Sequence, residues 1–197
     1  MTAAGIGHNR GPTAEPGTGW RRHCWTRARA ELLPTLPLEV VRLRVARAKA
    51  IGLDYTTYAT VRATSGCDIV GFLFSSNALR LLRSADSMPQ DRVLRLDAIK
   101  DCDRILLARP PLDPMCLAQA IEMRHAILFE GAAPAPGFPA SWRSQRERLR
   151  AVLAASRLPA AGVLLVGDTG FEREWAEAAR LAGYLPAERY FPSTAAG

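Results

Sequence analysis

Hydrophobic residues recur every three or four positions in several stretches of the chain, which is the spacing of a helix with one buried face. The clearest stretch is 38–51, followed by Gly52 in a position typical of helix ends. A second helix is predicted over 55–65, because Asp54 can cap its start and Gly66 can end it. A third, more basic helix is predicted over 19–33, upstream of these two.

The stretch 69–83 allows two interpretations. Residues 69–74 form a short apolar run, which periodicity alone cannot assign to a strand or a helix. Apolar positions continue at helical spacing as far as Leu82, which favours a helix over 69–83 with Asp68 as its cap. Two helices joined at Gly66 have the outline of a helix-turn-helix. The first turns of the second helix are apolar, however, and would not read base edges, so this helix belongs in a core.

After about residue 89 the pattern alternates between short apolar runs and amphipathic stretches, with a Gly- and Pro-rich loop at 131–139. The strands predicted here are 104–108, 125–129 and 162–166, and the helices are 113–124, 140–156, 171–182 (ended by Gly183) and one that begins at Pro89. Alternating strands and helices indicate a parallel sheet covered by helices. The predicted fold is therefore α/β, a helical N-terminal region followed by a small parallel-sheet α/β layer.

Three regions follow from this pattern and from local composition. Residues 1–18 are rich in Gly, Pro and Thr and are expected to form a flexible arm. Residues 19–100 are expected to form a basic helical region, and residues 101–197 a small α/β domain. The chain of 197 residues, 48% hydrophobic and 23% charged, has the size and composition of a globular protein with one core, or with one core and a small appended module.

The sequence also predicts a compartment. No apolar run approaches the roughly 18 residues of a membrane span, and the N-terminus lacks the apolar segment of a signal peptide. The four cysteines lie far apart, with no Cys-x-x-Cys pair for zinc: Cys24, Cys67, Cys102 and Cys116. We therefore expect a cytoplasmic protein whose cysteines are reduced and mostly packed as small hydrophobic residues, with no metal site predicted.

The net charge of +7 is unevenly distributed. Residues 1–52 hold nine Lys and Arg against three Asp and Glu, residues 53–110 hold eight against seven, and residues 111–197 hold nine of each. A localised basic surface attracts phosphate backbones or acidic proteins. The alternative is a solvated helix surface in a chain that uses arginine throughout. The candidate contacts to an anionic partner are Arg21, Arg22, Arg27, Arg29, Arg42 and Arg47.

The strongest local signal for chemistry is the segment Gly167, Asp168, Thr169 and Gly170, between a predicted strand and a predicted helix. Ligands of open α/β sheets sit at the carboxyl ends of strands, where loop amides and a helix N-terminus hold anions. The two glycines would let the backbone approach a phosphate, and Asp168 could bind a metal or accept a proton. The alternative is an ordinary turn in which Thr169 or Asp168 caps the helix.

The stretch Val166-Gly-Asp-Thr169, with a following helix that ends at Arg180-Leu-Ala-Gly183, resembles the fourth motif of haloacid-dehalogenase-type phosphatases. The resemblance covers under a tenth of the chain. It implies a catalytic strand that ends Asp-x-Asp, and no such strand is predicted upstream. Without that nucleophile the family's chemistry has no starting residue, and we do not assign the chain to the family.

These observations leave functions from different classes. The first is a binding or regulatory protein that engages an anionic partner, nucleic acid or an acidic protein, through its basic N-terminal helices. The alternative is an enzyme that acts on a phosphorylated or nucleotide-like substrate at the turn around Asp168. A third is a subunit that mainly packs against other proteins. The sequence identifies no cofactor and no oligomeric state.

Overall fold

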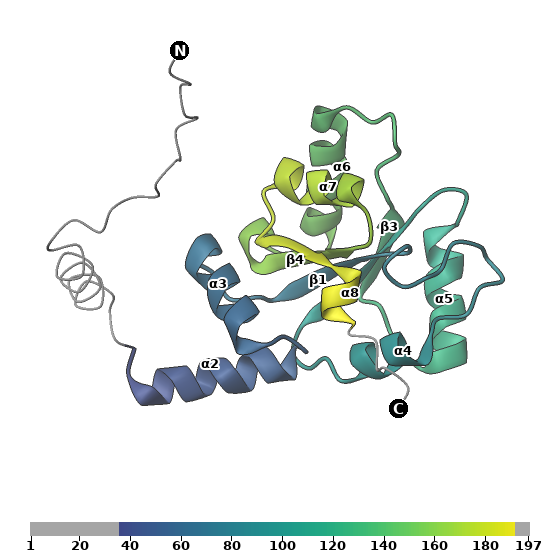
Figure 1. Cartoon of the computed structure of the whole chain (residues 1–197). Helices are drawn as coiled ribbons and strands as arrows, with labels where there is room; N and C mark the ends of the chain where they lie inside the picture. Colours follow the sequence, from purple (N-terminus) through teal and green to yellow (C-terminus); the bar gives the residue numbers. More distant parts are fainter. Residues whose placement is uncertain (1–35, 192–197) are drawn as a thin grey trace, which may run out of the picture. The chain divides into compact units, whose positions relative to one another are not determined.

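The computed structural model describes residues 36–191, and from Arg42 onward they form one compact unit built on a five-stranded sheet (Figure 1). Every neighbouring pair of strands is parallel, and the order across the sheet is β3-β2-β1-β4-β5. The strands are β1 (Gly71–Ser75), β2 (Asp103–Ala108), β3 (Gly131–Pro134), β4 (Val163–Gly167) and β5 (Gly183–Pro186).

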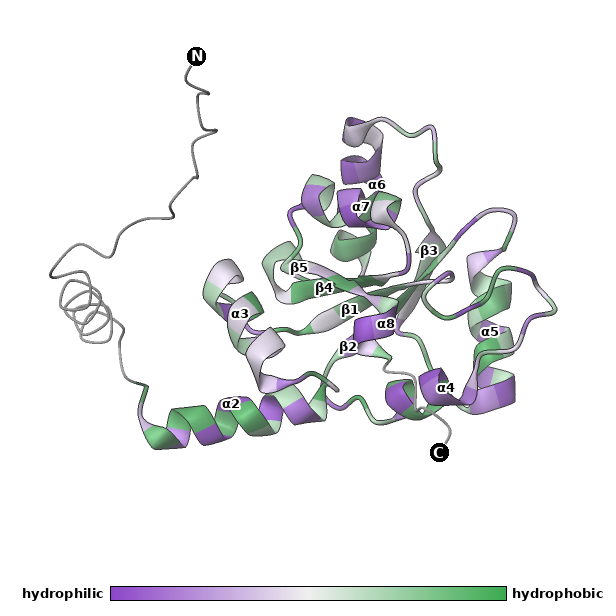
Figure 2. Cartoon of the chain, viewed as in Figure 1, coloured by the Kyte–Doolittle hydropathy of each residue, from purple (hydrophilic) through white to green (hydrophobic). Residues whose placement is uncertain are grey.

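Helices cover both faces of the sheet, which confirms the predicted α/β fold with a helical N-terminal region. They are α2 (Leu38–Ala50), α3 (Tyr55–Ser65), α4 (Gln90–Asp97), α5 (Pro114–His125), α6 (Trp142–Ala155), α7 (Gly170–Ala179) and α8 (Ala187–Tyr190), with a 3-10 turn at Ala160–Gly162. Side chains alternate along β1: Phe72 and Phe74 pack with α2, α3, α4, α5 and α8, whereas Leu73 packs with α6 and α7. Figure 2 shows mainly hydrophobic residues along the central strands, whereas the flanking helices carry both hydrophobic and hydrophilic residues.

The strand order reverses at the centre of the sheet. The chain runs outward from β1 through β2 to β3, then returns to the other side of β1 for β4 and β5. Helices α4 and α5 make the first crossovers, and α6 and α7 make the later ones on the opposite face. The carboxyl ends of β1 and β4 therefore form a topological switch point, the place where open α/β sheets bind ligands.

Helices α2 and α3 begin and end within one residue of the predicted bounds, and the helix predicted over 19–33 lies outside the described residues. Asp54 caps α3 by accepting a hydrogen bond from the Thr57 amide at 2.8 Å. Gly66 ends α3 in the left-handed conformation, with φ of 73°. Gly52, which follows α2, also has a positive φ, 72°.

The helix predicted over 69–83 is wrong, because this stretch contains the central strand β1 and a turn after it. All five residues of β1 are buried, and a strand covered on both faces is continuously apolar, so it carries no period-2 signal. Asp68 accordingly caps no helix; it accepts a hydrogen bond from the Tyr58 hydroxyl at 2.7 Å. No helix-turn-helix forms here, and the sheet begins before residue 101.

The strand predicted at 125–129 is also wrong, since α5 continues to His125 and β3 lies at Gly131–Pro134, inside the expected loop. Proline is tolerated in β3 because this is an edge strand, whose outer side needs no amide donor. Similarly, Gly183 does not end a helix. Helix α7 stops at Ala179, and Gly183 begins the second edge strand, β5.

The cysteines are less buried than expected. Cys67 and Cys116 are exposed, Cys102 is half-buried, and all three are free thiols; Cys24 lies outside the described residues. Burial raises the pKa of Cys102 to about 12, so this thiol stays protonated. Within residues 36–191 no helix is both long and apolar enough to cross a membrane.

Candidate functional site

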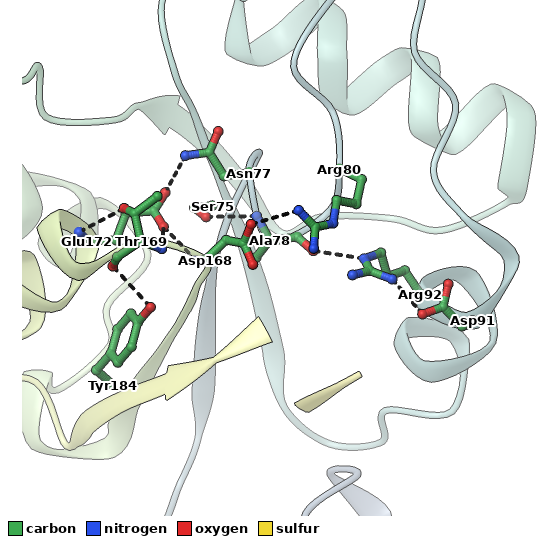
Figure 3. Close-up of polar contacts among 10 residues, drawn as sticks. All are labelled: Ser75, Asn77, Ala78, Arg80, Asp91, Arg92, Asp168, Thr169, Glu172 and Tyr184. Atoms are coloured by element: carbon green, nitrogen blue, oxygen red, sulfur yellow. Dashed lines mark hydrogen bonds and ion pairs between the residues drawn. The ribbon is translucent and has the colours of Figure 1, made fainter. Parts of the chain in front are cut away.

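The segments that follow β1 and β4 meet at the switch point (Figure 3). The two strands are neighbours, with Phe74 paired to Val166, so the loops after them lie side by side. One loop contributes Asn77 and Arg80, and the other contributes Asp168. The junction at Gly167–Gly170 is therefore a strand-to-helix junction at the carboxyl edge of the sheet, as the sequence predicts.

Glu172 lies at the centre of this site and is fully buried. Its carboxylate accepts hydrogen bonds from the amide nitrogen Nδ2 of Asn77 at 2.9 Å and from the backbone amides of Asp168 at 2.6 Å and Thr169 at 3.0 Å. A buried carboxylate is stable only when it is compensated in this way. The loop amides that would hold an external anion are thus donating to the chain's own carboxylate.

The local sequence explains why Glu172 points inward. Thr169 is the N-cap of α7 and accepts from the Glu172 amide at 3.3 Å, while the Glu172 side chain returns to the Thr169 amide. This reciprocal pair is a capping box, so the alternative of Thr169 as a helix cap is confirmed. Gly167 is required for space, since a Cβ atom there would lie 2.7 Å from the Tyr184 ring. A Cβ atom on Gly170 would meet nothing within 4 Å.

Asp168 and Arg80 form the outer part of the site. Arg80 donates from Nη1 to the Asp168 carboxylate at 2.8 Å, and the two side chains are 53% and 26% exposed. Arg80 has a positive φ of 61°, uncommon for a residue with a side chain. The pair joins the loop after β1 to the loop after β4, beside Glu172 (Figure 3).

The hydroxyl groups at the end of β1 are engaged in the fold. Ser75 and Ser76 are both fully buried. Ser75 Oγ accepts from the Ala78 amide at 3.1 Å, and Ser76 Oγ accepts from the Arg109 amide at 3.2 Å. Arg92 supports the same turn by donating from Nε to the Ala78 carbonyl at 2.9 Å (Figure 3). These groups fix the loop and are not presented to a substrate.

The residue types after β1 bear on the phosphatase resemblance. The strand beside β4 ends at Ser75 and is followed by Ser76 and Asn77, so hydroxyl and amide groups stand where an Asp-x-Asp motif would place carboxylates. The one Asp-x-Asp of the chain, 101–103, precedes and begins β2 and lies at the opposite, amino-terminal edge of the sheet. The site contains no carboxylate nucleophile in the position that the resemblance implies.

Sequence reasoning missed three of the residues that build the site: Asn77, Arg80 and Glu172. Asn77 and Arg80 were hidden because their stretch has helical spacing. Glu172 did carry a signal, since Thr169 and Glu172 have the spacing of a capping box, which aims the glutamate back at the loop amides.

The basic residues proposed for an anionic partner are only partly within the described residues. Arg42 is exposed on α2. Arg47 is half-buried, and it donates to the carbonyl groups of Ile69 at 2.8 Å, Asp101 at 2.9 Å and Lys100 at 3.2 Å. Its charge therefore holds α2 against the loops at the amino-terminal edge of the sheet. Arg21, Arg22, Arg27 and Arg29 lie outside the described residues.

Comparison with protein families, with curated proteins and with solved structures finds no match to this chain. Over residues 36–191, no three His, Cys, Asp or Glu side chains lie together as a metal site would require.

Proposed function

We propose that this chain is a binding or regulatory protein that engages an anionic partner through its basic N-terminal region, and that its α/β layer is a scaffold or the site of a small effector. One observation carries the proposal. The ligand position that the fold would offer, at the ends of β1 and β4, is filled by the buried carboxylate of Glu172. A phosphate at the same amides would have to displace this carboxylate and leave it buried without donors, which is unfavourable.

The charge distribution supports the basic N-terminal region as the binding surface. Residues 1–52 carry a surplus of six positive charges, whereas residues 111–197 are neutral. Nucleic acid is the partner to test first, because arginine forms bidentate contacts with phosphate groups. Such binding is dominated by phosphate contacts and weakens steeply with salt. Arg47 contributes to the fold, so the arginines assigned to the partner are Arg42 and the four in 21–29.

The test is a fluorescence anisotropy titration of the full chain against duplex and single-stranded oligonucleotides, at low and physiological ionic strength. A variant with Gln at all four arginines of 21–29 is compared with a control of equal charge loss, Gln at Arg124, Arg143, Arg148 and Arg150, all exposed on α5 and α6. The slope of log K against log salt should fall by about 0.9 for each arginine that contacts a duplex phosphate. Absence of binding at low ionic strength, or equal losses in both variants, would overturn the proposal.

An enzyme acting on a phosphorylated or nucleotide-like substrate remains the second candidate, and one observation favours it. Arg80 and Asp168 come from different loops and meet at the switch point, where ligands of such folds bind. A thermal-shift panel of phosphorylated ligands tests it, because a ligand of the native state raises the apparent stability. Gly170→Val is a suitable blocking variant, since the added side chain meets no protein atom at its Cβ position. Stabilisation that persists in Gly170→Val and Asp168→Ala would exclude this site.

A further inference from the structure

A cavity of about 450 Å³ lies between α7 and β5, on the outer side of the sheet edge. Three arginines border it, although they come from different elements: Arg173 on α7, Arg180 at the C-terminal cap of α7, and Arg189 on α8. Glu177 is the one acidic residue in its lining, so the lining carries a net positive charge. The sequence gives no sign of this cluster, because residues 111–197 are neutral as a whole.

The three arginines lack the partners that other arginines of this protein have. Arg62, Arg80 and several others pair with carboxylates. Among the described residues, no carboxylate pairs with Arg173, Arg180 or Arg189. Part of this charge is offset inside the protein, because Arg189 helps to lower the pKa of Asp54 and Glu177 lies in the lining. The positive charge that remains favours binding of an anion.

Two of the three arginine side chains are held by contacts with the fold. The Arg173 guanidinium lies over the Tyr184 ring, 5.2 Å from its centre. Arg189 donates from Nη2 to the Thr57 hydroxyl at 2.8 Å. Arg180 has a positive φ of 56°, and its exposed side chain starts from the C-terminal cap of α7. Side chains oriented before binding lose less entropy when they contact a ligand.

We infer that this cavity binds the phosphate group of a small phosphorylated molecule. Guanidinium groups bind phosphate in a bidentate manner, and three of them supply the donors for one phosphate. The volume falls within the usual range of small-molecule sites, roughly 300–1,000 Å³. Leu181, Tyr184 and Pro186 also line the cavity and give the organic part of the ligand an apolar surface. This site is separate from the N-terminal surface proposed above and takes a different class of ligand.

Isothermal titration calorimetry of the full chain tests the inference, with inorganic phosphate, a sugar phosphate and a nucleoside monophosphate as probes. We expect saturable binding that is weakened by salt. The variant Arg180→Gln should weaken it roughly tenfold or more, the usual effect of losing a charged hydrogen bond. The matched control is Arg148→Gln on α6, which removes the same charge from an exposed position and should leave the affinity unchanged.

A single-stranded oligonucleotide forms the last arm and separates a free phosphorylated molecule from a nucleic-acid backbone. Three results would overturn the inference: no saturable heat with any small probe at low ionic strength, equal affinity in Arg180→Gln and the parent chain, or an Arg180→Gln effect confined to the oligonucleotide. Because the arginines of 21–29 are unchanged in these variants, the outcome is independent of the N-terminal binding proposal.

Discussion

Helix α7 contributes residues to two regions that differ in whether the chain itself compensates their charges. Its first turn places the Glu172 carboxylate in the switch point, where every oxygen is supplied with donors from the chain. Its side and its end contribute Arg173 and Arg180 to the cavity beside β5, where no described carboxylate pairs with them. Topology alone points to the first region as the ligand site. The charges point instead to the second region, whose arginines have no carboxylate partner among the described residues. Charge is the better criterion, because a group that already has its hydrogen-bond partners gains little free energy from binding a ligand.

The largest effect on stability is expected when the Glu172 carboxylate is removed from the switch point. Glu172→Ala leaves the Asn77 amide and the amides of Asp168 and Thr169 without an acceptor in a buried site. We expect the free energy of unfolding to fall by about 3–5 kcal/mol, as when buried polar networks lose one partner. Urea denaturation measures it.

Glu174→Ala is the control, because Glu174 is exposed on the same helix and should change stability by less than about 0.5 kcal/mol. If the two variants were equally stable, the carboxylate of Glu172 would not be what closes the site.

The next largest effect on stability is expected at Arg47, a cation whose hydrogen-bond acceptors come from the chain itself. Arg47→Ala removes three hydrogen bonds to backbone carbonyls and a neighbour of Asp68, 3.6 Å away. We expect a loss of about 2 kcal/mol by urea denaturation, in the range for charged hydrogen bonds. Lys49→Ala, on the exposed side of α2, should change stability little. If Arg47→Ala kept full stability but lost nucleic-acid affinity, Arg47 would belong to the binding surface and not to the fold.

A smaller and pH-dependent effect is expected at Asp54, the cap of α3. Hydrogen bonds from the Thr57 side chain and amide hold the pKa of Asp54 below its ordinary value of 3.8. Its stabilisation is therefore complete above that value and is lost as the pH falls through the lowered pKa. Asp54→Ala should cost about 1 kcal/mol at neutral pH, and the difference from the parent chain should shrink in acid. A difference that stayed constant in acid would show that the carboxylate charge does not matter there.

The smallest effect is expected for the exposed pair above Glu172. Arg80→Ala should lower stability by less than about 1 kcal/mol, because both partners are partly solvated. Chemical denaturation at two ionic strengths checks this, since salt should reduce the difference further. A loss comparable to that of Glu172→Ala would mean that the outer pair, and not the buried carboxylate, holds the two loops together.

The sequence was sufficient where local chemistry decides the structure. Asp54 and Gly66 predict both ends of α3, because capping and a left-handed residue act within a few positions. It was insufficient where burial decides. Strand β1 has helical spacing by coincidence and is a strand because it lies between β2 and β4. In β3 the residues are typical of turns, and only pairing with β2 makes them a strand.

The same division holds for the sites. The junction at Asp168 was predicted from its glycines and its preceding strand. The occupation of this junction by the Glu172 carboxylate was not predicted. Asn77 lies 95 positions from Glu172 in the sequence, and the two side chains meet only because β1 and β4 are neighbours. The arginine cavity was beyond sequence reasoning for a similar reason. Acidic and basic residues are equal in number over 111–197, and the three arginines gather at one cavity only when α7, β5 and α8 pack together.

The most direct test of the central claim, that the chain itself occupies its switch point, is a nitrogen–proton NMR titration of the full chain with inorganic phosphate. The signals to follow are the backbone amides of Asp168 and Thr169, which donate to Glu172. We predict that they do not shift at phosphate concentrations that saturate any other site. A saturable shift of both amides, removed by Gly170→Val, would contradict the account and restore the switch point as a ligand site.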